Sequence, residues 1–216
     1  MFKSTVTLTR RAALVVALAL TPAAWALPEA QFQPAFAQFL QATSGNESAI
    51  EQSANSFSLL LKQEPSNPVL MAYAGAATAM KATTTMLPWK KMSFAEDGMA
   101  LLDKALALLT PAHNAALQHD VPSALEVRFV AANTFLAVPG FMNRAARGNK
   151  LLGEILASPL LAQAPLSFRG DVWMKAATVA AKDKRTDDAR KYLNEVINAN
   201  APQTQAARAQ LSAVAS

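Results

Sequence analysis

Residues 173–193 read WMKAATVAAKDKRTDDARKYL, and this stretch decides the fold. From Trp173 to Ala180, small and bulky apolar residues recur at intervals of three and four, which is the spacing of one helix face. The mixed-charge run 182–191 follows, and a second apolar series that includes Ala189 and Leu193 begins within it. The stretch therefore predicts two antiparallel helices joined by a short, solvated turn.

The same spacing continues through most of the chain, and no window shows sustained alternation with β-branched residues. Because proline disrupts helix interiors, the prolines divide the chain into separate helices. The sequence therefore predicts an all-α protein. The expected helices are 29–41, 47–63, 67–84, 94–109, 112–119, 122–137, 141–156, 166–182, 186–199 and 202–214.

The pattern of the opening stretch recurs twice earlier in the chain. Residues 71–78 with 98–102 form a second copy, and residues 128–135 with 146–150 form a third, weaker one. In each copy a proline follows nine residues after the last bulky position, which is Leu102, Lys150 or Leu193. Small residues on the first helix of each pair would let the second helix approach closely.

This pattern resembles the tetratricopeptide repeat, whose first helix carries W-x2-L-G-x2-Y and whose second carries A-x3-F before a closing proline. Trp173, Ala176, Ala177 and Ala180 match the first-helix spacing, although alanine replaces the larger residues. The resemblance covers roughly residues 47–202 and implies antiparallel helix pairs stacked as a right-handed solenoid, in a single domain over 27–216. Such scaffolds commonly bind proteins or peptides. A non-repeating, alanine-rich bundle produces similar spacings and stays open as the alternative.

One connection between paired helices is unusually long. Gly98 lies twenty positions after Thr78, and the residues between them include the segment TTTMLPWKKMSF at 83–94. Residues 136–144 form a shorter analogue in the third copy. If the copies stack, the two connections lie side by side and form an apolar lip with a basic rim. The residues predicted to bind a partner at this lip are Met86, Trp89, Lys90, Lys91, Phe94, Phe141, Met142 and Arg144.

Three other interpretations of the long connection remain. It can fold over the helix ends as a structural plug, or it can cover a cavity that carries a small apolar ligand under residues 84–94. Contact with phospholipid suits a tryptophan beside lysines, but one short segment anchors weakly, so peripheral membrane contact is not expected.

The N-terminus predicts export. Lys3, Arg10 and Arg11 precede the apolar run 12–20, and Ala24-Trp25-Ala26 has the small residues that signal peptidase requires. Residues 1–26 are expected to be a signal peptide cleaved after Ala26, which addresses the protein to the periplasm. Its removal leaves 17 basic against 15 acidic residues, so nucleic acid is not an expected partner. The chain has no cysteine and therefore no disulfide.

No combination of residues predicts catalysis, a cofactor or a metal site. The only histidines, His113 and His119, are expected on different faces of a helix at the surface. The acidic pairs 96–97 and 187–188 are expected at helix starts, where carboxylates complement the helix dipole. The sequence predicts a binding or adaptor protein of the cell envelope, with a carrier of a small apolar ligand as the alternative.

Overall fold

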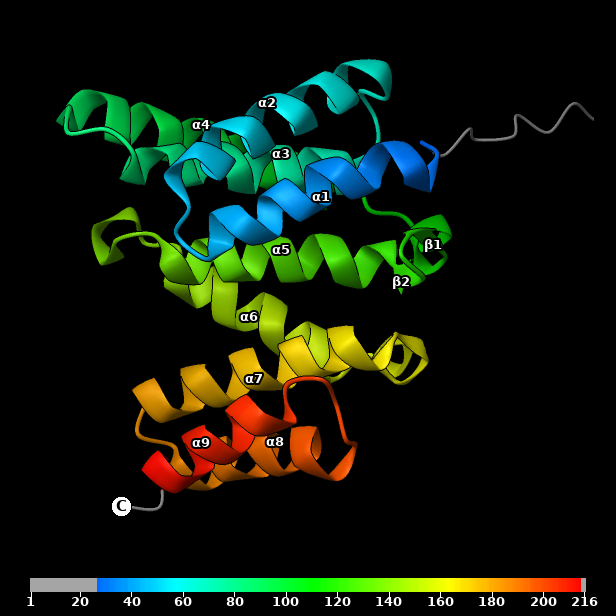
Figure 1. Ribbon diagram of the computed structural model, residues 1–216, viewed down its shortest axis with the longest axis vertical. Helices are drawn as coiled ribbons and strands as arrows, with labels where there is room; N and C mark the ends of the chain where they lie inside the picture. The colour runs from blue at the N-terminus through cyan, green and yellow to red at the C-terminus, as the bar shows by residue number, and fades with distance from the viewer. Residues whose placement is uncertain (1–26, 215–216) are drawn as a thin grey trace, which may run out of the picture.

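The computed structural model describes residues 27–214, and over this range the protein is all-helical, as predicted (Figure 1). The α-helices of the described range are α1 (Glu29–Thr43), α2 (Glu47–Gln63), α3 (Pro68–Met80), α4 (Pro88–Ala107), α5 (Ser123–Ala137), α6 (Ala145–Leu156), α7 (Leu166–Lys182), α8 (Thr186–Asn198) and α9 (Thr204–Val214). Short 3-10 helices lie between some of them: η1 (Lys81–Thr83), η2 (Pro111–Asn114), η3 (Gly140–Met142) and η4 (Pro159–Gln163). The predicted signal peptide lies outside the described residues.

The predicted start of the helix 94–109 was wrong at a proline. α4 begins at Pro88, six residues before the predicted start, because proline fits the first turn of a helix, where its missing N–H has no partner to lose. The connection after α3 is correspondingly short, and only residues 84–87 lie outside a helical element. The segment 83–94 is thus mostly the end of a helical hairpin, and the acidic pair 96–97 lies inside α4 rather than at its start.

The predicted helix 112–119 does not form. After η2 the chain makes a small antiparallel hairpin of β1 (Ala116–Gln118) and β2 (Val121–Pro122). His119 and Asp120 occupy its turn with φ of 34° and 58°, a backbone region that a right-handed helix cannot contain. This hairpin lies beside the start of α5 (Figure 1) and sets where His119 enters the fold.

Close helix packing follows the predicted pairs, with α3 on α4, α5 on α6 and α7 on α8. α3 and α4 approach closely at two glycines: a Cβ on Gly98 would lie 2.5 Å from the carbonyl oxygen of Gly75. In the third copy the predicted register was wrong, because Ala146 and Lys150 are exposed. Gly148 faces α5 instead, so the buried stripe of α6 is shifted by two residues.

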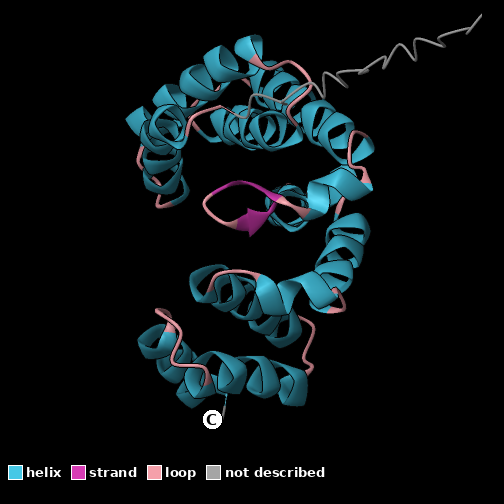
Figure 2. Ribbon diagram, turned by 90° about the vertical axis from the view of Figure 1, so that its right-hand side faces the viewer, coloured by secondary structure: helices cyan, strands magenta, loops and turns pink. Residues whose placement is uncertain are grey.

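The helices follow one another around an arc that is open on one side (Figure 2). One hydrophobic core runs continuously from α1 to α7, and it includes Phe32, Phe57, Leu102 and Phe135. A second, smaller core joins α7, α8 and α9 around Leu193. Within residues 27–214, no helix combines the length and the hydrophobicity that crossing a membrane requires.

Candidate binding groove

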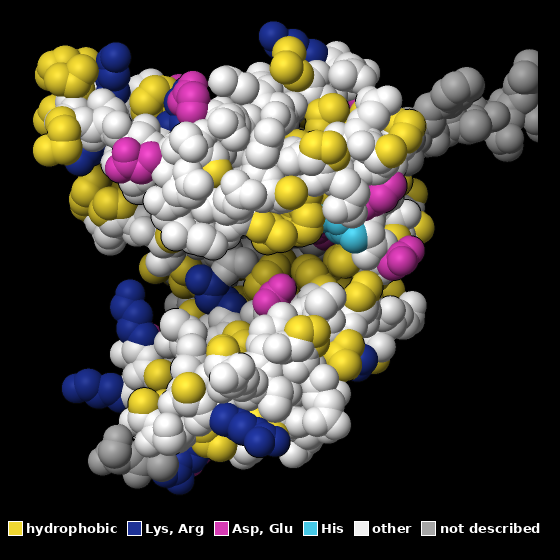
Figure 3. Space-filling view, viewed as in Figure 1, with side chains coloured by type: hydrophobic (Ala, Val, Ile, Leu, Met, Phe, Trp, Pro, Cys, Tyr) yellow, Lys and Arg dark blue, Asp and Glu magenta, His cyan; other side chains and the backbone are white. Residues whose placement is uncertain are grey.

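A groove of about 720 Å³ crosses the face shown in Figure 3, where hydrophobic side chains gather between the upper and the lower helices. Its walls come mainly from α1, α3, α5 and α7, with smaller contributions from η1 and α9. Among the paired helices, α3, α5 and α7 are each the first of their pair. A volume of this size is in the range of sites for small molecules and short peptide segments.

Aromatic rings form two walls of the groove. On one side, Tyr73 of α3 packs against Phe36 and Phe39 of α1, with ring centroids 5.6 and 4.9 Å apart. On the other side, Phe129 of α5 and Phe168 of α7 form an edge-to-face pair at 5.3 Å. Because these rings pack against one another, their side chains have little conformational entropy to lose when a ligand binds. They therefore form a rigid apolar surface.

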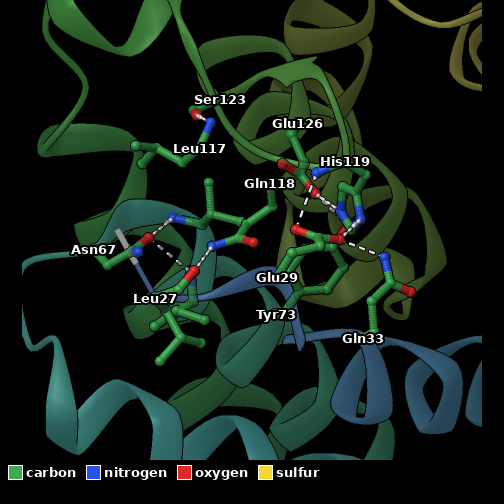
Figure 4. Close-up of polar contacts among 12 residues, drawn as sticks. Leu27, Glu29, Gln33, Asn67, Tyr73, Leu117, Gln118, His119, Ser123 and Glu126 are labelled. Atoms are coloured by element: carbon green, nitrogen blue, oxygen red, sulfur yellow. Dashed lines mark hydrogen bonds and ion pairs between the residues drawn. The ribbon is translucent and has the colours of Figure 1, made fainter. Parts of the chain in front are cut away.

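A carboxylate lies at the base of the groove. Glu126 of α5 lines the groove and is 2% exposed. Its Oε1 accepts a hydrogen bond from the Tyr73 hydroxyl at 2.8 Å and lies 2.7 Å from His119 Nε2 (Figure 4). Its Oε2 is buried and has no hydrogen-bond partner in the described part of the chain. A residue of the groove lining therefore has one buried carboxylate oxygen with unused capacity to accept a hydrogen bond.

Burial and pairing shift the pKa values of this cluster. Desolvation raises the pKa of Glu126 above its usual value, and the contacts with His119 and Tyr73 oppose that rise without cancelling it. Desolvation lowers the pKa of His119, but the hydrogen bond and charge of Glu126, together with the charges of Glu29 and Asp120, outweigh it, so the net pKa is raised. Burial and then Glu126 also raise the pKa of Tyr73, which keeps the hydroxyl protonated as a donor.

Residues of the same cluster also contact the N-terminal end of the described range. His119 Nδ1 lies 3.5 Å from a carboxylate oxygen of Glu29, and the Gln118 side chain donates to the carbonyl oxygen of Leu27 at 3.1 Å (Figure 4). The β1–β2 hairpin thus holds the beginning of α1 against α5. The expectation of a surface position for His119 was wrong, because its side chain is only 18% exposed and packs on Phe32 and Phe36.

The α7 side of the groove carries two ionisable groups. Asp171 accepts a hydrogen bond from Gln203 at 2.7 Å, and burial raises its pKa. Lys175 lies one turn further along and also lines the groove; burial lowers its pKa, and it has no ion-pair partner in residues 27–214. These groups, together with Asn133 and Thr178, give a mostly apolar groove a few polar contacts for orienting a ligand.

The structure separates the residues of the predicted lip. Met86 and Trp89 are 87% and 67% exposed at the end of the α3–α4 hairpin, and Lys90 and Lys91 are exposed beside them. Phe141, in η3, is 68% exposed. A plug would bury these side chains, so the plug interpretation is wrong.

The remaining lip residues have structural contacts. Phe94 is half-buried under the ammonium group of Lys81, at 4.8 Å, and Met142 packs on the core. Arg144 pairs with Asp103 of α4 at 3.0 Å. Since Asp103 is about four turns, or ~20 Å, along α4 from Trp89, Arg144 does not form a rim for Trp89.

Sequence reasoning missed the groove residues Phe36, Tyr73, Glu126 and Phe129. One signal was present: Glu126 interrupts the apolar run 124–127, and a lone acid in such a run requires a buried partner. The partners themselves come from distant segments. His113 is not part of the site, since it forms a capping box with Thr110. No group of side chains within residues 27–214 is arranged to hold a metal ion.

Searches of protein families, curated proteins and solved structures found no match to this chain.

Proposed function

We propose that this chain is an exported, tetratricopeptide-like helical-repeat protein of the cell envelope, which binds an apolar segment of a protein partner in its groove and performs no catalysis. One observation carries the proposal. The groove is lined mainly by α1, α3, α5 and α7, the alternate helices of the chain, so successive helix pairs contribute to one continuous binding surface.

The packing of the pairs supports a stacked arrangement. Gly75 meets Gly98 between α3 and α4, and the buried residues Ala177 and Ala189 occupy corresponding small-residue positions in α7 and α8. Small residues at these positions bring the second helix of a pair close to the first, which leaves the opposite face of the first helix free to line a groove.

The chemistry of the groove supports an apolar segment with a few hydrogen-bonding groups. The two aromatic walls supply apolar contact, and the unused Oε2 of Glu126 is an acceptor for an N–H or O–H donor. Because both Tyr73 and His119 already contact Glu126 Oε1, the cluster is better suited to holding helices and a ligand than to moving protons.

The cell-envelope location rests on the N-terminal pattern of basic residues, apolar run and small-residue cleavage site. The absence of cysteine and the near-balanced charge after residue 26 agree with a protein that relies on core packing and does not bind nucleic acid.

Site-specific photo-crosslinking in cells tests the groove. A photoreactive residue at Thr178, which lines the groove and is exposed, is compared with one at Ala100, which is exposed on α4 outside it. A protein adduct from position 178 alone, lost when Ala137→Trp fills the groove, is the expected result. An adduct from position 100 that survives Ala137→Trp, with none from 178, would reject the groove as the partner site.

A second candidate is a carrier of a small apolar ligand, favoured by the volume of the groove and its mostly apolar lining. One end of the groove reaches Ala82, Thr83 and Ala95, which flank the segment 84–94, a four-residue connection and the start of α4. This candidate predicts a small molecule that co-purifies with the folded protein, is released by organic extraction, and is absent from the Ala137→Trp variant. The partner hypothesis predicts protein adducts without such a molecule.

A further inference from the structure

The end of the α3–α4 hairpin, residues 84–92, contains most of the large hydrophobic side chains that are exposed in the described chain; we call it the tip. Four of the seven large hydrophobic residues that are exposed in residues 27–214 belong to it: Met86, Leu87, Trp89 and Met92. None of them lines the groove. Apolar side chains that support neither the core nor the groove point to contact with something outside the chain.

The charge of the tip has one sign. Lys90 and Lys91 are exposed in the first turn of α4, and neither has an ion-pair partner within the described residues. That turn contains no acidic residue, and the next acids along α4, Glu96 and Asp97, come one to two turns later. A surface that complements the tip is therefore anionic.

Other cations and one more apolar side chain share this edge of the molecule. Figure 1 shows the tip, the α5–α6 connection and the α7–α8 turn along the same edge. The α5–α6 connection exposes Phe141. The α7–α8 turn exposes Lys182 and Lys184, which have no ion-pair partner in the described range, together with the acids Asp183 and Asp187. A broad, flat partner can contact all three connections at once, whereas the tip alone is too short to anchor firmly.

We infer that this edge, led by the tip, docks on an anionic lipid bilayer. A convex cluster of tryptophan, methionine and leucine inserts at the level of the lipid headgroups without needing a preformed pocket, and lysines beside it reach anionic phosphates while their stems stay in apolar contact. Trp89 is suited to this boundary because its ring is apolar and its indole N–H still forms a hydrogen bond. The contact is peripheral and reversible, and it does not depend on what the groove binds.

Quenching of Trp89 by lipid tests the inference in the full chain. In the variant Trp25→Phe/Trp173→Phe, Trp89 is the single tryptophan, so the fluorescence reports on Trp89 and not on a tryptophan within residues 1–26. Vesicles of phosphatidylcholine and phosphatidylglycerol, with bromine on the acyl chains, should quench Trp89, and vesicles of phosphatidylcholine alone should quench it much less. In the matched variant Trp25→Phe/Trp89→Phe, the half-buried Trp173 should stay unquenched.

The lysines provide the second measurement. Lys90→Gln/Lys91→Gln should raise the lipid concentration needed for half-maximal quenching by about 30-fold, because each cation near an anionic surface contributes about 1 kcal/mol. The control Lys62→Gln/Lys104→Gln removes the same charge from exposed positions near the far ends of α2 and α4 and should change it little. Either of two results would overturn the inference: Trp89 unquenched on anionic vesicles, as expected if the tip binds a protein, or equal effects of the two lysine pairs.

Discussion

The groove and the tip are both apolar, but only the groove is built into the fold. Tyr73 in the groove packs on Phe36, Phe39 and Phe57 and donates a hydrogen bond to buried Glu126. Trp89 in the tip is 67% exposed. A substitution in the groove therefore changes folding and binding together, whereas a substitution in the tip leaves folding almost intact. Substitutions in the tip therefore test binding without a large change in stability. Substitutions in the groove require that stability be measured together with binding.

The largest expected effect comes from the helix contact that positions a groove wall. Gly98→Ala should lower the free energy of unfolding by about 2 kcal/mol, because the new Cβ overlaps the Gly75 carbonyl oxygen and the Ala79 backbone, and α3 must move. Chemical denaturation measures it. Gly153→Ala is the matched control: nothing lies within 4 Å of its Cβ position, so the variant should gain up to about 1 kcal/mol from helix propensity. Equal effects at both glycines would show that the close approach is not limiting.

The base of the groove should give an intermediate effect that depends on pH. His119 has a raised pKa in the folded protein, so its contribution to stability is complete below its usual pKa of 6.5 and is lost as the pH rises through the folded value. Glu126 acts in the same direction. Because its pKa is raised in the folded protein, its ionisation at higher pH lowers the free energy of unfolding. The free energy of unfolding should therefore fall as the pH rises, above 4.5 through Glu126 and above 6.5 through His119 as well.

The variant His119→Gln isolates the histidine from the carboxylate. It should lose about 1 kcal/mol of stability below pH 6.5, where the charged hydrogen bond is present, and should differ less from the parent above that range. Urea titrations across the pH range measure the difference. A loss that is the same at every pH would mean that His119 supports the fold by packing on Phe32 and Phe36 alone.

The smallest effect on stability is expected at the tip. Met86→Ser/Trp89→Ala should change the free energy of unfolding by less than about 0.5 kcal/mol, since both side chains are mostly exposed. Thermal and chemical denaturation of the double variant check this. A loss of 2 kcal/mol or more would mean that the tip is part of the folded core and would remove the contrast with the groove.

Local signals predicted most of the helices, and two of them were predicted to the residue. The range 47–63 is α2, which begins after Asn46, whose side chain accepts a hydrogen bond from Ala49 N–H; the range 166–182 is α7, which follows Pro165. In both cases the residue that precedes the helix and the spacing of the apolar residues indicate the same helix start. The error at Pro88 came from treating a proline as a helix end, although proline at the first position of a helix is favourable.

The groove was not predictable because its parts are brought together by the tertiary fold. Tyr73 and Glu126 are 53 residues apart, and nothing local to either residue indicates the other. His119 reaches them from a turn that adopts positive φ, which histidine and aspartate tolerate better than most residues. The residues of the tip could be named from the sequence because their exposure depends on one hairpin. Their separation from Arg144 could not, since it depends on how far α4 extends.

The hydrogen bond from the Gln118 side chain to the Leu27 carbonyl oxygen has a consequence for the order of folding. It joins residues 91 positions apart, and Glu29 and His119 add a second link between the same two segments. A chain that emerges with its N-terminus first cannot complete the packing of α1 until the β1–β2 hairpin has also emerged, because loop closure must precede contacts of long sequence separation. During synthesis or translocation, Phe32 and Phe36 therefore lack their contact with His119 until the β1–β2 hairpin has emerged, and α1 stays incompletely packed until then.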